Sequence, residues 1–244
     1  MKRVYFTILF IGMFFFVFGL GRCFAKPLEV GMLHFPPYYE IKGTDQVEGI
    51  FVDFLKKVMD EADIEYTFKG YPPRRLYQNV ASGKTDIWMG TTDVKAYEGK
   101  VEVSPERIVN IYLRAYSVGD TPVAKSPADL KGKSVITIHG YNYAGFIKFL
   151  KAPDNNIQIN DTPTRKQALK MLQKGRADYL IDYKMPLENT LDKMSAIEDL
   201  KFGDLKEIGI YINVSKKTPN TSEVMDNIMD AYQTLQEKGE LDFN

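Results

Sequence analysis

Hydrophobic and polar positions along this chain follow two periods, one typical of buried strands and one of amphipathic helices. Residues 28–33 (LEVGML) form a short apolar run that predicts a strand. Residues 49–64 (GIFVDFLKKVMDEADI) place apolar side chains near helical spacing, and residues 64–71 (IEYTFKGY) alternate like a strand again. A strand, a helix and a strand in this order predict a right-handed crossover in a parallel sheet.

One pattern occurs twice: a helical run ending in glycine, then a basic residue, a spacer, an aspartate and a strand. The copies are residues 79–92 (NVASGKTDIWMGTT) and residues 171–183 (MLQKGRADYLIDY). Gly83 and Gly175 are the expected helix caps, because glycine takes the left-handed conformation without a steric cost. The apolar run after each aspartate suits a buried parallel strand. Two copies therefore predict two similar α/β lobes.

The aspartates of this repeated pattern, Asp86 and Asp178, are expected to be structural. Each precedes a predicted strand, where its carboxylate can accept hydrogen bonds from nearby backbone amides. Ligands of parallel sheets bind beyond the carboxyl ends of the strands. The loops that follow the two strands, at Thr92 and Tyr183, are therefore where function is expected.

Two segments are predicted to cross between the lobes and form a hinge. Residues 101–119 are strand-rich with few helix signals, and residues 205–214 alternate as a strand before an amphipathic helix at residues 222–237. In the second lobe we expect a strand at residues 134–139, a helix opened by Gly140 and a helix at residues 165–174. The expected boundaries are residues 26–111 and 208–244 for lobe 1, and residues 112–207 for lobe 2.

Residues 1–25 have the features of a cleavable export signal. Lys2 and Arg3 precede an uncharged apolar stretch, and Cys23-Phe24-Ala25 ends in a small residue. The alternative is a retained membrane anchor, because the 18 residues from 4 to 21 approach the length of a short spanning helix. Arg22 argues against a lipoprotein signal, which needs a small residue before the cysteine. A periplasmic location is expected.

Composition then excludes several classes of protein. Removing residues 1–25 removes the only cysteine, so disulfides, thiolate catalysis and cysteine metal sites are excluded. It also removes three basic residues, which takes the net charge from zero to about −3. Nucleic-acid binders show a basic excess, so no nucleic-acid partner is expected. The two histidines, His34 and His139, lack a spaced third ligand, so no metal site and no cofactor are expected.

Several segments follow one another along the chain: FPPYYE, VEGIFVDFLKKVMDEADI, LYQNVASGKTDIWMGTT, SPADLKGKSVITIHG, ALKMLQKGRADYLID and the closing amphipathic helix. In their order and spacing, they resemble the periplasmic solute-binding proteins of family 3. Members of this polar amino-acid type serve ATP-driven importers. The resemblance covers nearly all of residues 26–244. It implies a two-lobed α/β fold of the type II periplasmic-binding-protein class, with two similar lobes joined by a two-strand hinge that closes on a small ligand.

The same resemblance implies that the usual charged anchors of the ligand are replaced. The family arginine that grips the ligand carboxylate corresponds to Tyr97. The family aspartate that pairs with the ligand ammonium corresponds to Tyr183, with Asp182 one residue earlier. A one-residue offset on a strand turns the side chain to the other face, so Asp182 is only a substitute candidate.

Other candidate contacts come from loops and helix starts. Phe35 corresponds to the family's aromatic ring against the ligand, and Tyr38 follows on the same loop. Thr92, with its neighbour Thr91, corresponds to the place where a hydroxyl and a backbone amide meet the ligand. Less characterised members of the family suggest a further ligand contact from an arginine. In this sequence, Arg75 is favoured over Arg74 for that contact.

The segment Gly140-Tyr141-Asn142 is expected to open a helix whose free amides receive an anion. Tyr141 and Asn142 are therefore also candidate ligand contacts. Trp88 is interpreted as a core residue.

The expected function is capture of a small polar or amino-acid-like ligand and its delivery to the membrane permease of an ABC importer. We expect the protein to act as a monomer, and we do not expect it to be an enzyme. One alternative is a sensor subunit that reports the ligand to a signalling receptor, since it needs the same closing lobes. The other is an enzyme similar to the cyclohexadienyl dehydratases. That reading needs a poised acid, and no paired carboxylates or catalytic set stand out in the sequence.

Overall fold

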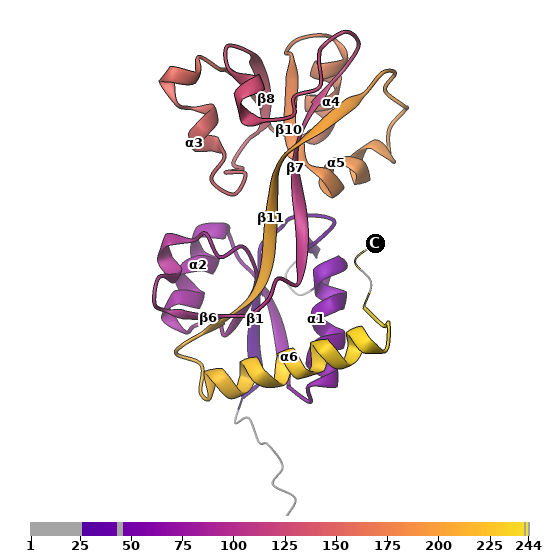
Figure 1. Cartoon of the computed structure of the whole chain (residues 1–244). Helices are drawn as coiled ribbons and strands as arrows, with labels where there is room; N and C mark the ends of the chain where they lie inside the picture. The colour runs from indigo at the N-terminus through magenta and orange to yellow at the C-terminus, as the bar shows by residue number, and fades with distance from the viewer. Residues whose placement is uncertain (1–25, 43–45, 242, 244) are drawn as a thin grey trace, which may run out of the picture.

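The computed structural model describes residues 26–42, 46–241 and 243. These residues form two α/β lobes joined by two long strands (Figure 1). The expected export signal, residues 1–25, lies outside the described residues. Within the part of the chain that is described, no helix is long and apolar enough to cross a membrane.

Lobe 1 is built on a parallel sheet in which β1 pairs with β4 on one side and β5 on the other. Helix α6 returns to this lobe from the end of the chain and packs on α1, where the rings of Phe54 and Tyr232 lie 6.0 Å apart. The elements of the lobe are β1 (Leu28–Met32), β2 (Glu40–Lys42), β3 (Gln46–Glu48), α1 (Ile50–Glu61), β4 (Tyr66–Gly70), α2 (Pro73–Ser82), β5 (Ile87–Gly90), η1 (Lys95–Tyr97), β6 (Val101–Val103) and α6 (Thr221–Glu237).

Lobe 2 repeats the parallel arrangement, with β8 between β9 and β10. Its buried side chains gather around α4, in a cluster that includes Leu169, Leu172 and Leu180. The elements are η2 (Pro127–Leu130), β8 (Ser134–Ile138), α3 (Ile147–Leu150), η3 (Pro153–Asn155), β9 (Gln158–Thr162), α4 (Arg165–Gln173), β10 (Tyr179–Tyr183) and α5 (Lys184–Leu191).

The crossing strands are β7 (Val109–Ser117) and β11 (Lys201–Ser215), which run antiparallel to each other between the lobes (Figure 1). Strand β11 also pairs with β5 in lobe 1, and β7 also pairs with β10 in lobe 2. Arg107 lies just before β7 and donates from Nη1 to Oε1 of Glu207 at 3.0 Å, which ties the two strands together. The two crossings predicted from the sequence are therefore present.

The repeated glycine pattern produces the same helix end in both lobes. Gly83 and Gly175 have φ angles of 77° and 64°, in the left-handed region. The next amide in each copy reaches back five residues, from Lys84 to Asn79 at 2.9 Å and from Arg176 to Met171 at 3.1 Å. This is the Schellman motif, which uses the carbonyl groups that the helix end leaves free.

Asp86 and Asp178 have the structural role that was predicted. Asp86 accepts from the Glu29 amide at 2.8 Å, and Asp178 accepts from the Ser134 amide at 2.7 Å. Each carboxylate thus joins its own strand to the neighbouring parallel strand, β1 in lobe 1 and β8 in lobe 2.

The helix predicted to open at Gly140 is a wrong prediction. Residues 141 and 142 have no regular structure, residues 143–146 form turns, and the only helix in this described segment is the four-residue α3, which begins at Ile147. Tyr143, Ala144 and Gly145 have positive φ angles of 54°, 49° and 83°, which a right-handed helix does not admit. The anion site based on free amides at a helix start is therefore withdrawn.

Candidate functional site

Aromatic rings from both lobes meet where the strands end. Phe35 lies in the turn after β1, and Tyr183 is the last residue of β10. Their ring centroids are 4.9 Å apart in an edge-to-face contact, and Phe35 lies 6.0 Å from the ring of Tyr141. Because Phe35 belongs to lobe 1 and the two tyrosines to lobe 2, this contact holds the lobes together at the carboxyl ends of their strands.

Two more rings complete what we name the interlobe aromatic cluster. Tyr38 lies 5.2 Å from Phe35 and stacks at 4.6 Å on Phe51 of α1. Tyr143 contacts both Tyr141 and Tyr183, with ring centroids 5.9 Å and 5.8 Å away. The members of the cluster are Phe35, Tyr38, Tyr141, Tyr143 and Tyr183.

A second set of rings lines lobe 1 beside the cluster. Trp88 stacks on Tyr39 at 5.5 Å, and the Tyr77 ring contacts both Trp88 at 6.4 Å and Tyr97 at 5.9 Å. The Trp88 ring folds over Gly90, where any Cβ would collide with it. Glycine at this position is therefore what lets the indole lie flat at the end of β5.

Tyr97, at the position where the resemblance leads one to expect an arginine, is almost fully buried, with 4% of its surface exposed. Its hydroxyl has no hydrogen-bond partner among the described residues, and neither does Nε1 of the buried Trp88. Trp88 is buried as predicted, but this free donor distinguishes it from an ordinary core residue.

Asp182, the substitute candidate for the ammonium anchor, is fully buried and already paired. Its carboxylate accepts from Arg165, with Nε to Oδ2 at 2.7 Å and Nη2 to Oδ1 at 3.3 Å, and from the Tyr183 amide at 2.8 Å. The guanidinium of Arg165 also lies 5.1 Å from the centre of the Tyr141 ring. Burial alone would lower the pKa of Arg165, but the Asp182 carboxylate and Tyr141 together more than offset this, so the pKa is raised.

Arg165 was not identified from the sequence as part of this site. It is the first residue of α4, and the Thr164 hydroxyl caps that helix by accepting from the Gln167 amide at 3.2 Å. The feature of the sequence that could have pointed to Arg165 is Asp182, because an aspartate inside a buried strand requires a cationic partner.

Further charges surround the hinge side of the cluster. Arg114 of β7 is bonded to Asp204 at 2.6 Å and to Glu188 at 3.0 Å. Lys206 of β11 donates to the Ala144 carbonyl at 2.8 Å, which connects the hinge to the loop that carries Tyr143. Residues of the crossing strands therefore hold both α5, which follows β10, and the loop after β8.

The buried phenols of the site stay neutral. Burial raises the pKa values of Tyr97, Tyr143 and Tyr183 well above that of an ordinary phenol. For Tyr183, the neighbouring Asp182 and Tyr77 contribute to the same shift. Burial also raises the pKa of Tyr38, with help from Glu188 of lobe 2, so charges of one lobe act on groups of the other.

The remaining predicted residues lie outside the cluster. Arg75 is exposed in the first turn of α2, next to the exposed Arg74. Thr91 is half-buried and Thr92 is exposed, directly after β5. Asn142 is exposed, and its side chain accepts from the Ala144 amide at 3.2 Å.

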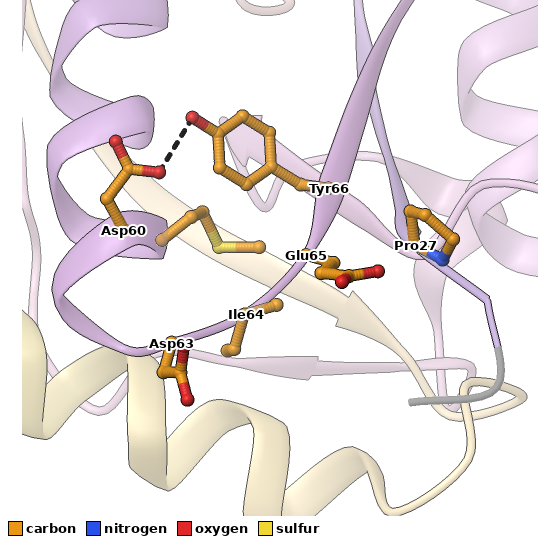
Figure 2. Close-up of a pocket in the computed structure, with 7 residues that line it drawn as sticks. Pro27, Asp60, Asp63, Ile64, Glu65 and Tyr66 are labelled. Atoms are coloured by element: carbon orange, nitrogen blue, oxygen red, sulfur yellow. Dashed lines mark hydrogen bonds between the residues drawn. The ribbon is translucent and has the colours of Figure 1, made fainter. Parts of the chain in front are cut away.

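An open hollow of about 480 Å³ lies at the other end of lobe 1 (Figure 2). It is next to Pro27 and Glu65, which precede β1 and β4, so it sits at the amino ends of the strands. Tyr66 donates there to Asp60 at 3.0 Å. Because ligands of parallel sheets bind at the carboxyl ends, we do not assign the hollow a ligand.

A second open hollow, also of about 480 Å³, follows the carboxyl ends of β1 and β4 and is lined in part by His34, Gly70 and Tyr71. Among the described residues, no group of three or more histidine, cysteine or acidic side chains is arranged to hold a metal ion.

Comparison with known proteins identifies relatives over most of the chain. The profile of the bacterial extracellular solute-binding proteins, family 3, matches residues 28–243. The L-cystine-binding protein TcyA of Bacillus subtilis (strain 168) is 25% identical over 212 residues, which cover 84% of this chain and 74% of TcyA.

Solved structures share the fold. The GluR0 ligand-binding core in complex with L-glutamate has a TM-score of 0.68 at 15% identity, over 90% of this chain and 98% of that one. A histidine kinase sensor domain with similarity to periplasmic binding proteins has a TM-score of 0.67 at 17% identity, over 88% and 92% of the chains. An ancestral arginine-binding protein bound to arginine has a TM-score of 0.65 at 20% identity, over 88% and 94%. The fold is therefore the two-lobed type II fold expected from the sequence.

Proposed function

The chain belongs to the bacterial extracellular solute-binding proteins, family 3, and from this premise we propose that it captures a small polar or amino-acid-like ligand between its lobes and delivers it to an ABC importer. The observation that carries the proposal is the contact of Phe35 with Tyr183 across the lobes. A ligand that enters there touches both lobes at once and stabilises the closed arrangement over the open one.

The hinge supports a closing motion. Among the described residues, only β7 and β11 pass between the lobes (Figure 1), and small changes of φ and ψ in a few strand residues rotate one lobe against the other. We propose that the closed form is what the membrane permease recognises, and that the protein acts as a monomer in the periplasm after removal of residues 1–25.

A binding role is favoured over catalysis by the state of the site's carboxylate. Asp182 is bonded to Arg165 and to a backbone amide, so it is not free to act as a general acid or base. The likeness to a histidine kinase sensor domain is one of fold, and it does not distinguish delivery to an importer from signalling.

The test is a distance measurement between the lobes. Residues 26–244 contain no cysteine, so cysteines introduced at Asp53 of α1 and Lys170 of α4, both exposed, can carry a donor and an acceptor dye. We expect energy transfer to change in a saturable way with one class of small solute, and the Phe35→Ala variant to respond more weakly. A panel of metabolites that leaves energy transfer constant would contradict the proposal.

A further inference from the structure

The proposed binding site contains two buried hydrogen-bond donors that the protein itself does not use. Trp88 Nε1 and the Tyr97 hydroxyl belong to side chains that are 5% and 4% exposed, and neither has a partner among the described residues. An indole N–H can only donate, and a buried donor left unsatisfied carries a free-energy cost in the folded state. Such a cost at two neighbouring positions indicates that a bound acceptor group completes the site.

These two donors lie next to the interlobe aromatic cluster. The Tyr77 ring contacts both Trp88 and Tyr97, and Tyr77 lies near enough to Tyr183 of the opposite lobe to contribute to its raised pKa. Tyr77 therefore links the unused donors to the surface where Phe35 meets the lobe 2 tyrosines.

The charges around the cluster disfavour an ammonium group. Asp182, the carboxylate at the end of β10, is fully buried and taken by Arg165. The other carboxylate that acts on the cluster, Glu188, is bonded to Arg114 at 3.0 Å, and the Lys206 ammonium lies against the Ala144 carbonyl. A zwitterionic amino acid placed here would lose the hydration of its ammonium without gaining Asp182 or Glu188 as an unpaired counter-ion.

We propose that the ligand is a ring-bearing molecule without an α-ammonium group, whose acceptor receives hydrogen bonds from Trp88 Nε1 and the Tyr97 hydroxyl. Its ring packs between Phe35 and the tyrosines of lobe 2, in place of the direct contact between them. Aromatic rings prefer offset or edge-to-face neighbours at about 4.5–7 Å, and a ligand ring would offer Phe35 such a neighbour in place of Tyr183 and Tyr141, which it now contacts at 4.9 Å and 6.0 Å. The inference rests on the proposed function and names the ligand class of the same site.

The experiment compares two series of probes on residues 26–244. One series is nicotinamide, benzamide, indole-3-acetate and benzoate; the other is L-arginine, L-glutamate, L-cystine and L-phenylalanine. Trp88 is the only tryptophan in the chain, so its fluorescence reports binding directly, and thermal shift gives an independent measurement. We expect at least one member of the first series to bind saturably and to change the Trp88 emission.

Two variants test the named donors. Tyr97→Phe keeps the ring and removes only the hydroxyl, and it is expected to weaken that binding about tenfold. Trp88→Phe, followed by thermal shift, is expected to weaken it similarly. The matched control is Tyr66→Phe, which removes a hydroxyl of the same lobe that is bonded to Asp60, away from the cluster. This variant should bind the ring-bearing probe with the affinity of the wild type.

A failure of this inference and a failure of the proposed function give different experimental results. If no ring-bearing probe binds, or if the ring-bearing probe that binds does so equally well to Tyr97→Phe and Trp88→Phe, the inference is overturned. Binding and lobe closure with the standard amino acids alone would overturn it too, while leaving the proposed function intact. The proposed function itself fails in the separate dye experiment, where no solute changes the distance between Asp53→Cys and Lys170→Cys.

Discussion

Arg165 and Asp182 form a bidentate ion pair inside lobe 2, with Nε to Oδ2 at 2.7 Å and Nη2 to Oδ1 at 3.3 Å. Because the carboxylate is fully buried, its removal leaves a guanidinium largely out of water without a counter-ion. We expect Asp182→Ala to lower the free energy of unfolding by about 3–5 kcal/mol, measured by urea denaturation.

The matched control for this pair is the double variant Arg165→Met/Asp182→Leu. Replacing both charges with apolar side chains of similar size removes the unpaired charge, so most of the lost stability should return. Unchanged stability of Asp182→Ala, together with loss of ligand binding, would contradict the structural role and would make Asp182 a ligand anchor.

A second prediction concerns alkaline pH. Burial raises the pKa values of Tyr97, Tyr143 and Tyr183 in the folded state above the ordinary phenol value of 10.0. Well below pH 10 these phenols are protonated in both the folded and the unfolded state. As the pH rises further, the unfolded chain releases protons first, so the free energy of unfolding falls with pH. Denaturation at a series of pH values, followed by tyrosinate absorbance, checks this.

The tyrosinate signal of the buried phenols should therefore appear together with unfolding and not before it. Tyr97→Phe should reduce the loss of stability above pH 10, because it removes one of the contributing groups. Ionisation of nearly all the tyrosines near pH 10 in a protein that keeps its near-ultraviolet circular dichroism would contradict the prediction.

The parts of the fold that were predictable depend on local chemistry. Gly83 and Gly175 end helices because of their own conformational freedom, and α1 follows from the spacing of its apolar residues. The helix expected after Gly140 failed because Tyr143 takes a left-handed conformation. It is held there in part by a hydrogen bond from the Ile138 amide to its hydroxyl at 2.6 Å, which sequence periodicity does not register.

Helix α5 and strand β9 were not predicted, also for physical reasons. Pro186 lies in the first turn of α5, where a proline is tolerated although it usually signals a break. Strand β9 carries Asn160 and Asp161, residues that are rare in strands. Its place is decided by pairing with β8.

For the candidate site, the loops were predictable from the ends of the strands, but the pairings between lobes were not. Phe35 and Tyr183 are far apart in the sequence, and nothing local encodes their contact. The Arg165–Asp182 pair lies inside lobe 2, and its contact is not encoded locally either. Both depend on how the lobes and helices pack, which a single sequence does not reveal.

A third prediction compares the two capping glycines. Both lie in the left-handed region, so replacement by alanine should lower the free energy of unfolding by about 1 kcal/mol at either position. At Gly83 the new Cβ would also collide with the Lys217 side chain, whereas at Gly175 no atom lies within 4 Å. We expect Gly83→Ala to be the more destabilising in urea denaturation; equal effects would contradict the collision.

The final prediction concerns acid. The hydroxyl and the amide of Ser134 both donate to the Asp178 carboxylate, at 2.6 Å and 2.7 Å, and these bonds lower its pKa below the ordinary 3.8. A lowered folded pKa gives stability that is present above pH 4 and is lost as the pH falls through the folded value.

Asp178→Asn should therefore lower the free energy of unfolding by about 1 kcal/mol at pH 7 and by less at pH 3. Urea denaturation at both pH values measures the difference, with Asp226→Asn, at an exposed position of α6, as the control. If Asp178→Asn loses as much stability at pH 3 as at pH 7, the carboxylate charge is not what joins β10 to β8, and the repeated aspartate acts through its shape alone.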